Sequence, residues 1–213
     1  MLMIEEREAL VRYGKRLLES GYVLGSGGNI SLIDRAEGLV AITPSGLPYE
    51  RMNIDDIVLL DLDGNTREGH LEPSSEYQLH LSLLAQRPDV NAVVHTHSPF
   101  ATAVACLGWD LPSFHYLVAV SGISIPCAPY AIYGSQQLAD NVCNVIGNGK
   151  AVLMANHGLV AVADTLAKAF EIAEIVEYLS RVYLQTRAVG HPQLLSEQEM
   201  TQVMGKFDSY GNQ

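Results

Sequence analysis

The chain has 213 residues, 48% of them hydrophobic and 17% charged, which predicts one domain over residues 1–213 with a substantial apolar core. Its formal net charge of −11 argues against nucleic acid as a partner, because nucleic-acid phosphates would be repelled. The longest apolar stretches are too short to span a membrane, so no membrane segment is expected.

The first part of the chain predicts one helix followed by short strands. Apolar residues at helical spacing indicate a helix over residues 3–20, and Gly21 ends it. Short apolar runs bounded by turns predict strands at 29–33, 39–43 and 57–61.

Helices and strands then alternate. Pro73-Ser74-Ser75-Glu76 opens a predicted helix that runs to about Gln86, with serine as the expected N-cap. This interleaving predicts a mixed α/β class with a largely antiparallel sheet. The later predicted elements are a strand at 91–97, a helix from Pro99 to Cys106, a strand-rich region at 116–128, a helix at 135–147, strands at 151–155 and 158–163, and a helix from Thr165 to about Ala188.

The most informative pattern is the pair of histidines His95 and His97 at the end of an apolar run. Alternate residues of a strand point to one face, so both imidazoles are expected to project together. His157 follows a second apolar run and adds a third imidazole at a strand end. Three nitrogen ligands with an open position suit a catalytic metal, and they favour zinc over cobalt and manganese.

Glu76 near a helix start has two interpretations. A carboxylate there commonly interacts with the helix dipole. Beside a metal, it could instead ligate the ion or take a proton from carbon next to a carbonyl. The other histidines are interpreted as core or surface residues, and they are His70, His80, His115 and His191.

Three turns combine glycine with polar side chains, and no basic cluster accompanies them. They are Gly27-Gly28-Asn29, Ser45-Gly46 and Ser74-Ser75. Such turns are often only turns, but their amides and hydroxyls could together bind a phosphate. Tyr116 and Tyr210 are candidate proton donors, although most tyrosines are structural.

The cysteines indicate the redox state of the compartment in which the protein is found. Cys106, Cys127 and Cys143 are odd in number and lack C-x-x-C spacing, so reduced thiols are expected. The acidic pair Glu5-Glu6 near the start predicts no signal peptide. We therefore expect a cytoplasmic protein.

The order of these motifs resembles the class II aldolases of the aldolase/adducin family along essentially the whole chain. The residues that carry the resemblance are Asn29 after a glycine turn, Thr43-Pro44-Ser45-Gly46, Pro73-Ser74-Ser75-Glu76, His95-x-His97, His115-Tyr116, Ser124-Ile125-Pro126-Cys127-Ala128-Pro129-Tyr130, Asn156-His157-Gly158 and Lys206-Phe207-Asp208-Ser209-Tyr210-Gly211.

The resemblance implies a three-layer α/β/α fold and a fourfold homotetramer with active sites at subunit interfaces. It implies zinc held by His95, His97 and His157, with Glu76 on or near the metal. Tyr116, and Tyr210 from a neighbouring subunit, would face the aldehyde end. The substrate phosphate would contact Gly28, Asn29, Ser45, Gly46, Ser74 and Ser75.

The implied reaction is reversible cleavage of a ketose 1-phosphate, with L-fuculose 1-phosphate as first choice, to dihydroxyacetone phosphate and L-lactaldehyde through an enediolate. Methylthioribulose or deoxyribulose 1-phosphate, a related dehydratase or epimerase, and an adducin-like binding module remain alternatives. Three residues depart from relatives: Ser45 for threonine, Thr96 for asparagine and Tyr133 for phenylalanine. Because the position of Tyr133 lies near the aldehyde side in these relatives, the resemblance does not fix which aldehyde is released.

Overall fold

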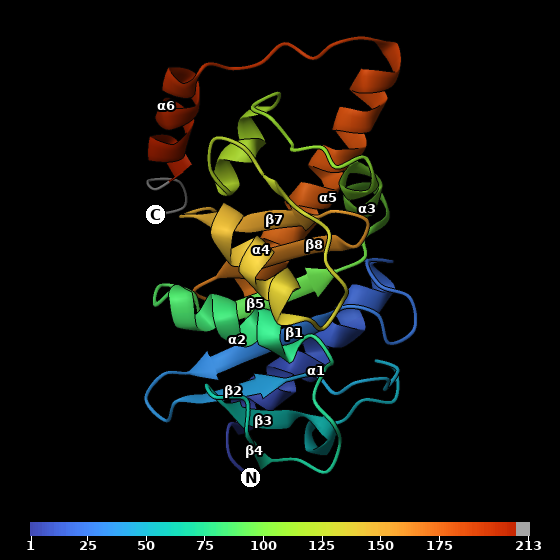
Figure 1. The fold of residues 1–213 in the computed structure, drawn as a ribbon, viewed down its shortest axis with the longest axis vertical. Helices are drawn as coiled ribbons and strands as arrows, with labels where there is room; N and C mark the ends of the chain where they lie inside the picture. The colour runs from blue at the N-terminus through green and yellow to red at the C-terminus, as the bar shows by residue number, and fades with distance from the viewer. Residues whose placement is uncertain (208–213) are drawn as a thin grey trace.

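Among the residues that the structure describes, eight strands form one sheet in the order β4-β3-β2-β1-β5-β8-β7-β6 (Figure 1). The computed structural model describes residues 1–207. Within that part of the chain, every neighbouring pair is antiparallel except β6 and β7, as expected for a mainly antiparallel sheet. The strands are β1 (Asn29–Asp34), β2 (Leu39–Ile42), β3 (Val58–Asp61), β4 (Thr66–Glu68), β5 (Ala92–Thr96), β6 (Cys127–Ala128), β7 (Ala151–Met154) and β8 (Gly158–Ala163).

Helices cover both faces of this sheet, which confirms the three-layer class. α2 and α4 pack together on one face, and α1, α3 and α5 lie on the other (Figure 1). Among the described residues, no helix has the length and apolar character needed to cross a membrane. The helices are α1 (Ile4–Glu19), α2 (Tyr77–Gln86), α3 (Pro99–Cys106), α4 (Gln136–Ile146), α5 (Leu166–Val189) and α6 (Glu197–Phe207), with 3-10 helices η1 (Ile54–Asp56) and η2 (Tyr116–Val120).

The starts of α4 and α5 follow from local chemistry. The side chain of Ser135 accepts a hydrogen bond from the backbone N–H of Leu138 at the start of α4. Thr165 does the same for Lys168 at the start of α5. Each side chain satisfies a backbone donor that has no partner within its helix, so these starts were predictable.

Residues 116–128 do not form the predicted strand-rich segment. The 3-10 helix η2 occupies the first five of them, and only the last two belong to β6. Gly122 has a φ of 146°, which interrupts an extended chain. The backbone N–H of Val118 bonds to the carbonyl of His115, a turn that a strand would not make. The short strand β4 and the last helix, α6, were not predicted.

Helix α2 begins at Tyr77, and its N-cap position is occupied by Glu76 and not by the predicted serine. Residues 72–74 are instead held extended: the backbone N–H of Ser74 bonds to the carbonyl of Thr43, and that of Ser45 bonds to the carbonyl of Glu72, each at 3.0 Å. This long-range pairing overrides the local capping signal. It places two of the predicted phosphate-binding turns side by side.

The register of β1 and β5 sets the position of the histidines. Asn29 lies directly opposite His95 in this antiparallel pair. Residues that face each other across two strands project to the same side of the sheet. Val93, two residues before His95, packs in the core under α2 and α4, so His95 and Asn29 project toward that layer.

Candidate metal centre and active site

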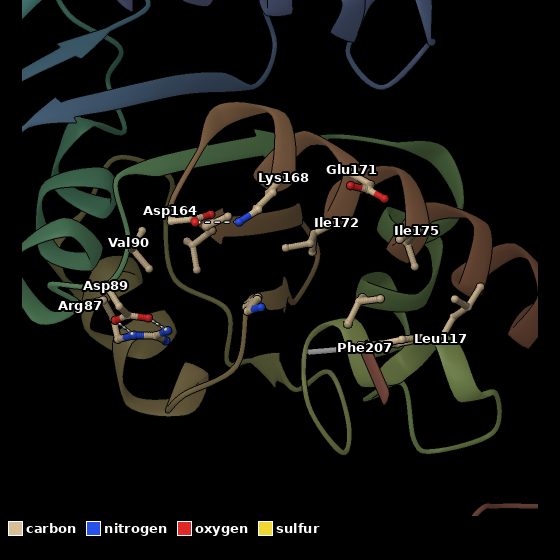
Figure 2. Close-up of a pocket in the computed structure, with 14 residues that line it drawn as sticks. Arg87, Asp89, Val90, Leu117, Asp164, Lys168, Glu171, Ile172, Ile175 and Phe207 are labelled. Atoms are coloured by element: carbon tan, nitrogen blue, oxygen red, sulfur yellow. Dashed lines mark hydrogen bonds and ion pairs between the residues drawn. The ribbon is translucent and has the colours of Figure 1, made fainter. Parts of the chain in front are cut away.

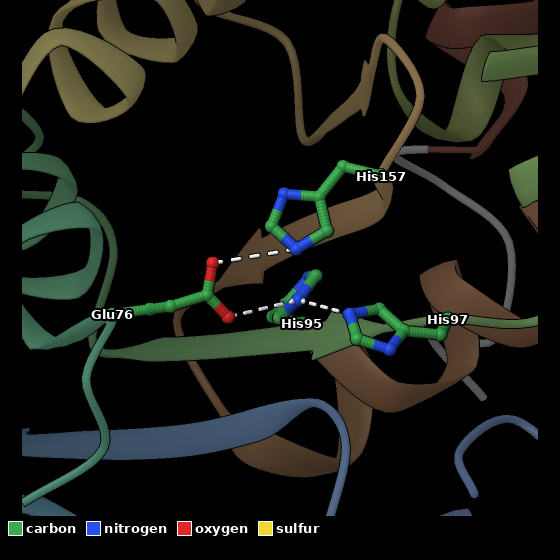
Figure 3. Close-up of side chains that lie close together, drawn as sticks. All are labelled: Glu76, His95, His97 and His157. Carbon is green, nitrogen blue, oxygen red and sulfur yellow. Dashed lines mark hydrogen bonds and ion pairs between the residues drawn. The ribbon is translucent and has the colours of Figure 1, made fainter. Parts of the chain in front are cut away.

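Four side chains converge at the end of β5 as the sequence predicted: Glu76, His95, His97 and His157 (Figure 3). The Nε2 atoms of His95 and His97 lie 3.0 Å apart. Glu76 Oε2 lies 3.2 Å from Nε2 of His95, and Glu76 Oε1 lies 3.4 Å from Nε2 of His157. One potential ligand atom from each residue lies within 4.8 Å of all the others.

Three separate segments supply these side chains. His95 is in β5, and His97 follows one residue after the strand ends. His157 lies in the turn between β7 and β8, after Asn156, whose φ is 56°. Gly158 closes that turn under Thr96, where an added Cβ would lie 2.3 Å from the Thr96 carbonyl oxygen. The position therefore requires glycine.

The donor atoms suit a divalent cation. His95 Nδ1 lies 2.9 Å from the carbonyl oxygen of Leu159 and donates to it, so Nε2 presents a lone pair to the cluster. Two imidazole nitrogens on a tetrahedral zinc would be separated by about 3.3 Å, close to the observed His95–His97 separation. Among residues 1–207, Glu76 Oε1 is buried without a hydrogen-bond partner. A cation would satisfy this oxygen and the lone pairs together.

The protonation states fit the same interpretation. Burial lowers the pKa of His97 to about 3 and that of His157 to about 4. Burial alone would raise the pKa of Glu76, but the charge of the neighbouring His95 lowers it overall. Burial lowers the pKa of His95, but the charge of Glu76 outweighs it and raises that pKa overall. The cluster therefore offers two neutral imidazoles, an anionic carboxylate and a His95 whose Nε2 proton a metal ion would displace.

A cavity of about 380 Å³ adjoins the cluster, and all six predicted phosphate-binding residues line it. Gly28 has a φ of 67°, and a Cβ there would lie 2.6 Å from the carbonyl oxygen of His95. Only glycine fits this turn beside β5. Within the described chain, no lysine or arginine lines the cavity, so an anion would be held by amides and hydroxyls.

The two predicted tyrosines are not brought to this cavity. Tyr116 in η2 is 50% exposed, stacks on His115 and packs near Phe207, and it is not part of the cavity wall. Tyr210 lies outside the described residues.

Sequence reasoning did not identify several residues at the site. Tyr130, Tyr133 and Asn156 also line the cavity. His80, interpreted as an ordinary core or surface histidine, is fully buried and reaches Glu76 through Asn29. Its position four residues after Glu76, one helical turn, was the available signal.

Comparisons with known proteins agree on one family. The sequence profile of the class II aldolase and adducin N-terminal domain matches residues 8–184. A 5-deoxy-D-ribulose 1-phosphate aldolase of Bacillus thuringiensis is 48% identical over 213 residues, covering 100% of both chains. An L-fuculose phosphate aldolase of Escherichia coli is 43% identical over 189 residues, covering 88% of this chain and 86% of its own.

A solved structure named L-fuculose 1-phosphate aldolase superposes with a TM-score of 0.95 at 41% identity, and the match covers 98% of each chain.

Proposed function

Because the chain belongs to the class II aldolase and adducin family, we propose that it is a metal-dependent lyase that reversibly cleaves a ketose 1-phosphate to dihydroxyacetone phosphate and a small aldehyde. The convergence of Glu76 with His95, His97 and His157 carries the proposal, together with the adjoining cavity, which among the described residues is lined by polar turns and by no lysine or arginine. The cluster would hold the metal ion that stabilises negative charge in such a reaction, and the cavity has room for the phosphorylated substrate.

The three histidines hold the metal through their Nε2 atoms, and Glu76 is the fourth ligand when no substrate is present. Zinc is the proposed ion, one per subunit, because three imidazoles with a position left for substrate is a common catalytic zinc site. The ion supplies a Lewis acid that stabilises the negative charge developed when the C3–C4 bond breaks.

Glu76 is the proposed base. In the synthetic direction its carboxylate takes a proton from the hydroxymethyl carbon of dihydroxyacetone phosphate, and in cleavage it returns that proton. Burial at 6% exposure keeps water from competing for this proton. Oε2 is held by the Asn29 side chain at 3.0 Å, so Oε1 is the oxygen left for the proton.

The substrate phosphate is proposed to bind far enough from the reacting bond to supply binding energy without taking part in the chemistry. The pairing of residues 72–74 with 43–45 brings two hydroxyl-bearing turns together for this purpose. The contacts come from Gly28, Asn29, Ser45, Gly46, Ser74 and Ser75.

We assign the aldehyde end to residues from a neighbouring subunit. Tyr116 is exposed and lies away from the cavity of its own chain. Near the cavity mouth, Tyr130, Ile132 and Tyr133 are also more than 60% exposed, and clustered exposed apolar groups mark contact surfaces. These observations support a subunit contact at this face, and we propose that it belongs to a fourfold homotetramer in which Tyr116 and Tyr210 of one subunit complete the site of the next.

Co-expression of two inactive variants tests this arrangement. Glu76→Gln and Tyr116→Phe subunits should each be slow alone, whereas random mixed tetramers should regain activity in about a quarter of their sites. Light scattering should give the mass of four chains. A tetramer without complementation would place Glu76 and Tyr116 in the same subunit's site.

The aldehyde distinguishes two candidate substrates with the same C1–C3 half. L-Fuculose 1-phosphate is the first candidate, supported by the Escherichia coli relative and the structural match. 5-Deoxy-D-ribulose 1-phosphate is the second, and the relative aligned along the full chain favours it. The two differ by a CH(OH) unit beyond C4.

A cleavage assay decides between them. Initial rates with L-fuculose, 5-deoxyribulose and methylthioribulose 1-phosphates should give at least one efficient substrate, and metal removal should abolish its cleavage while zinc restores it. Cleavage of none of the three, or cleavage insensitive to metal removal, would contradict the proposed function.

Two general proposals accompany this function. Residues 1–213 form one domain, as the continuous sheet from β4 to β6 supports. The cytoplasm is the proposed compartment, because Cys106, Cys127 and Cys143 are all free thiols.

A further inference from the structure

A series of hydrogen bonds between buried side chains connects Glu76 with His80 of α2 and Ser31 of β1. Asn29 Nδ2 donates to Glu76 Oε2 at 3.0 Å, and Asn29 Oδ1 lies within hydrogen-bond distance of His80 Nε2. On the other side of the imidazole, His80 Nδ1 lies 2.7 Å from Ser31 Oγ. His80 and Ser31 are fully buried, and Asn29 is 5% exposed.

Two backbone periodicities make this series of hydrogen bonds possible. Asn29 and Ser31 are alternate residues of β1, so they project to the same face of the sheet. Glu76 and His80 are separated by one helical turn at the start of α2, so they lie on the same side of that helix. The imidazole of His80 therefore contacts both strand residues at once.

The charge of Glu76 sets the direction of every hydrogen bond in the series. An ionised carboxylate only accepts, so the Asn29 side chain must present its nitrogen to Glu76 and its oxygen to His80. His80 must then carry its proton on Nε2, and Nδ1 accepts from the Ser31 hydroxyl. Burial lowers the pKa of His80 to about 3, which leaves the neutral ring that this arrangement requires.

We propose that His80 is a positioning residue that holds the Asn29 amide with its N–H groups toward Glu76 and the cavity. Without the His80 N–H, the amide can rotate and place its oxygen against the Glu76 carboxylate. That rotation would remove the hydrogen bond to Oε2 and the donor that Asn29 presents to a ligand. His80 acts on the reaction through Asn29, and the inference rests on the proposed role of Glu76 as base.

Two substitutions separate this role from space filling. In His80→Gln, the side-chain amide nitrogen reaches about as far as Nε2, so it can still donate to Asn29. In His80→Asn, the shorter amide replaces Nδ1, so it can keep the contact with Ser31 but cannot reach Asn29. His191, exposed between α5 and α6, provides the matched control His191→Asn.

The readout is the rate at which solvent hydrogen exchanges into the hydroxymethyl carbon of dihydroxyacetone phosphate, with bound metal and folded fraction measured in parallel. His80→Asn should lower kcat by about 10–100-fold, as expected for loss of an outer contact to a metal site. KM and metal content should change little, and His80→Gln should recover most of the rate. Equal rates in the two variants would overturn the role.

A measurement on the unmodified protein does not depend on folding of a variant. ¹⁵N NMR of the histidine-labelled chain should show His80 neutral with its proton on Nε2, and a proton on Nδ1 would overturn the inference. If the unmodified protein exchanges no hydrogen with dihydroxyacetone phosphate, the proposed function fails instead. Exchange in the unmodified protein with no loss in His80→Asn refutes the positioning role alone.

Discussion

Two cavities lie at opposite ends of the β7–β8 hairpin, and they differ in how their polar groups are satisfied. The cavity at the open end measures about 550 Å³ and is lined by Arg87, Lys150 and Lys168 together with carboxylates (Figure 2). Arg87 pairs with Asp89 at 2.6 Å, and Lys168 pairs with Asp164 at 2.7 Å. The smaller cavity, at the turn, adjoins Glu76 and the three histidines.

The difference shows that buried polar atoms without hydrogen-bond partners indicate a ligand-binding site better than the size of a cavity does. Two of the three cations in the larger cavity have a carboxylate partner, and the third, Lys150, is exposed to water. In the smaller cavity Glu76 Oε1 is buried without a hydrogen-bond partner among the described residues, while imidazole lone pairs face it. Buried polar groups are costly to leave unpaired, so a ligand is expected there.

The strongest test of this contrast is Glu76→Gln in the smaller cavity. Removing the base should slow hydrogen exchange at the hydroxymethyl carbon of dihydroxyacetone phosphate by about 10³-fold, within the range for general base catalysis. The measurement is proton NMR in deuterated buffer. Retained exchange would remove Glu76 from the role of base.

Replacing one imidazole should break the metal centre. His157→Ala leaves two histidines, and we expect zinc affinity to fall by at least about 100-fold because loss of an outer contact alone costs up to that much. Competition with a fluorescent chelator measures the affinity. A matched change in the larger cavity, Lys150→Ala, should leave it unaltered. Unchanged zinc affinity in His157→Ala would exclude that residue as a ligand.

Burial of His80 should make stability depend on pH. Its pKa is lowered to about 3 in the folded chain and is about 6.5 when unfolded. The unfolded state therefore binds more protons between these values, and stability is lost as pH falls below about 6.5, by up to ~1.4 kcal/mol per pH unit. Urea unfolding of the metal-free protein between pH 5 and 6.5 should show a smaller slope in His80→Gln. Equal slopes would mean that His80 titrates normally.

The smallest effect is expected where the phosphate is proposed to bind. Ser75→Ala should raise KM about tenfold with kcat nearly unchanged, because one hydrogen bond to a charged group contributes about 1.4 kcal/mol or slightly more. In the larger cavity, Lys150→Ala should leave KM unchanged. An effect on KM from Lys150→Ala but not from Ser75→Ala would contradict the proposal, because it would place the substrate phosphate in the larger cavity.

Much of the fold was predictable because its signals are local. The apolar spacing of α1 and α5, the turn glycines and the caps Ser135 and Thr165 act over a few residues, and the structure follows them. The orientation of His95 and His97 was equally accessible, since a strand alternates by geometry alone. Residues 116–128 failed because Gly122 and the turn at η2 outweigh their apolar composition.

The sequence by itself therefore determined the order of most elements, the paired histidines and the polar turns. Only the tertiary structure decided how they meet. The pairing of residues 72–74 with 43–45 delays the start of α2 and places Glu76 at its N-cap, facing the histidines. The packing of α2 against β1 places the buried His80 within hydrogen-bond distance of Asn29. Such contacts join segments tens of residues apart, and local periodicity carries no information about their register.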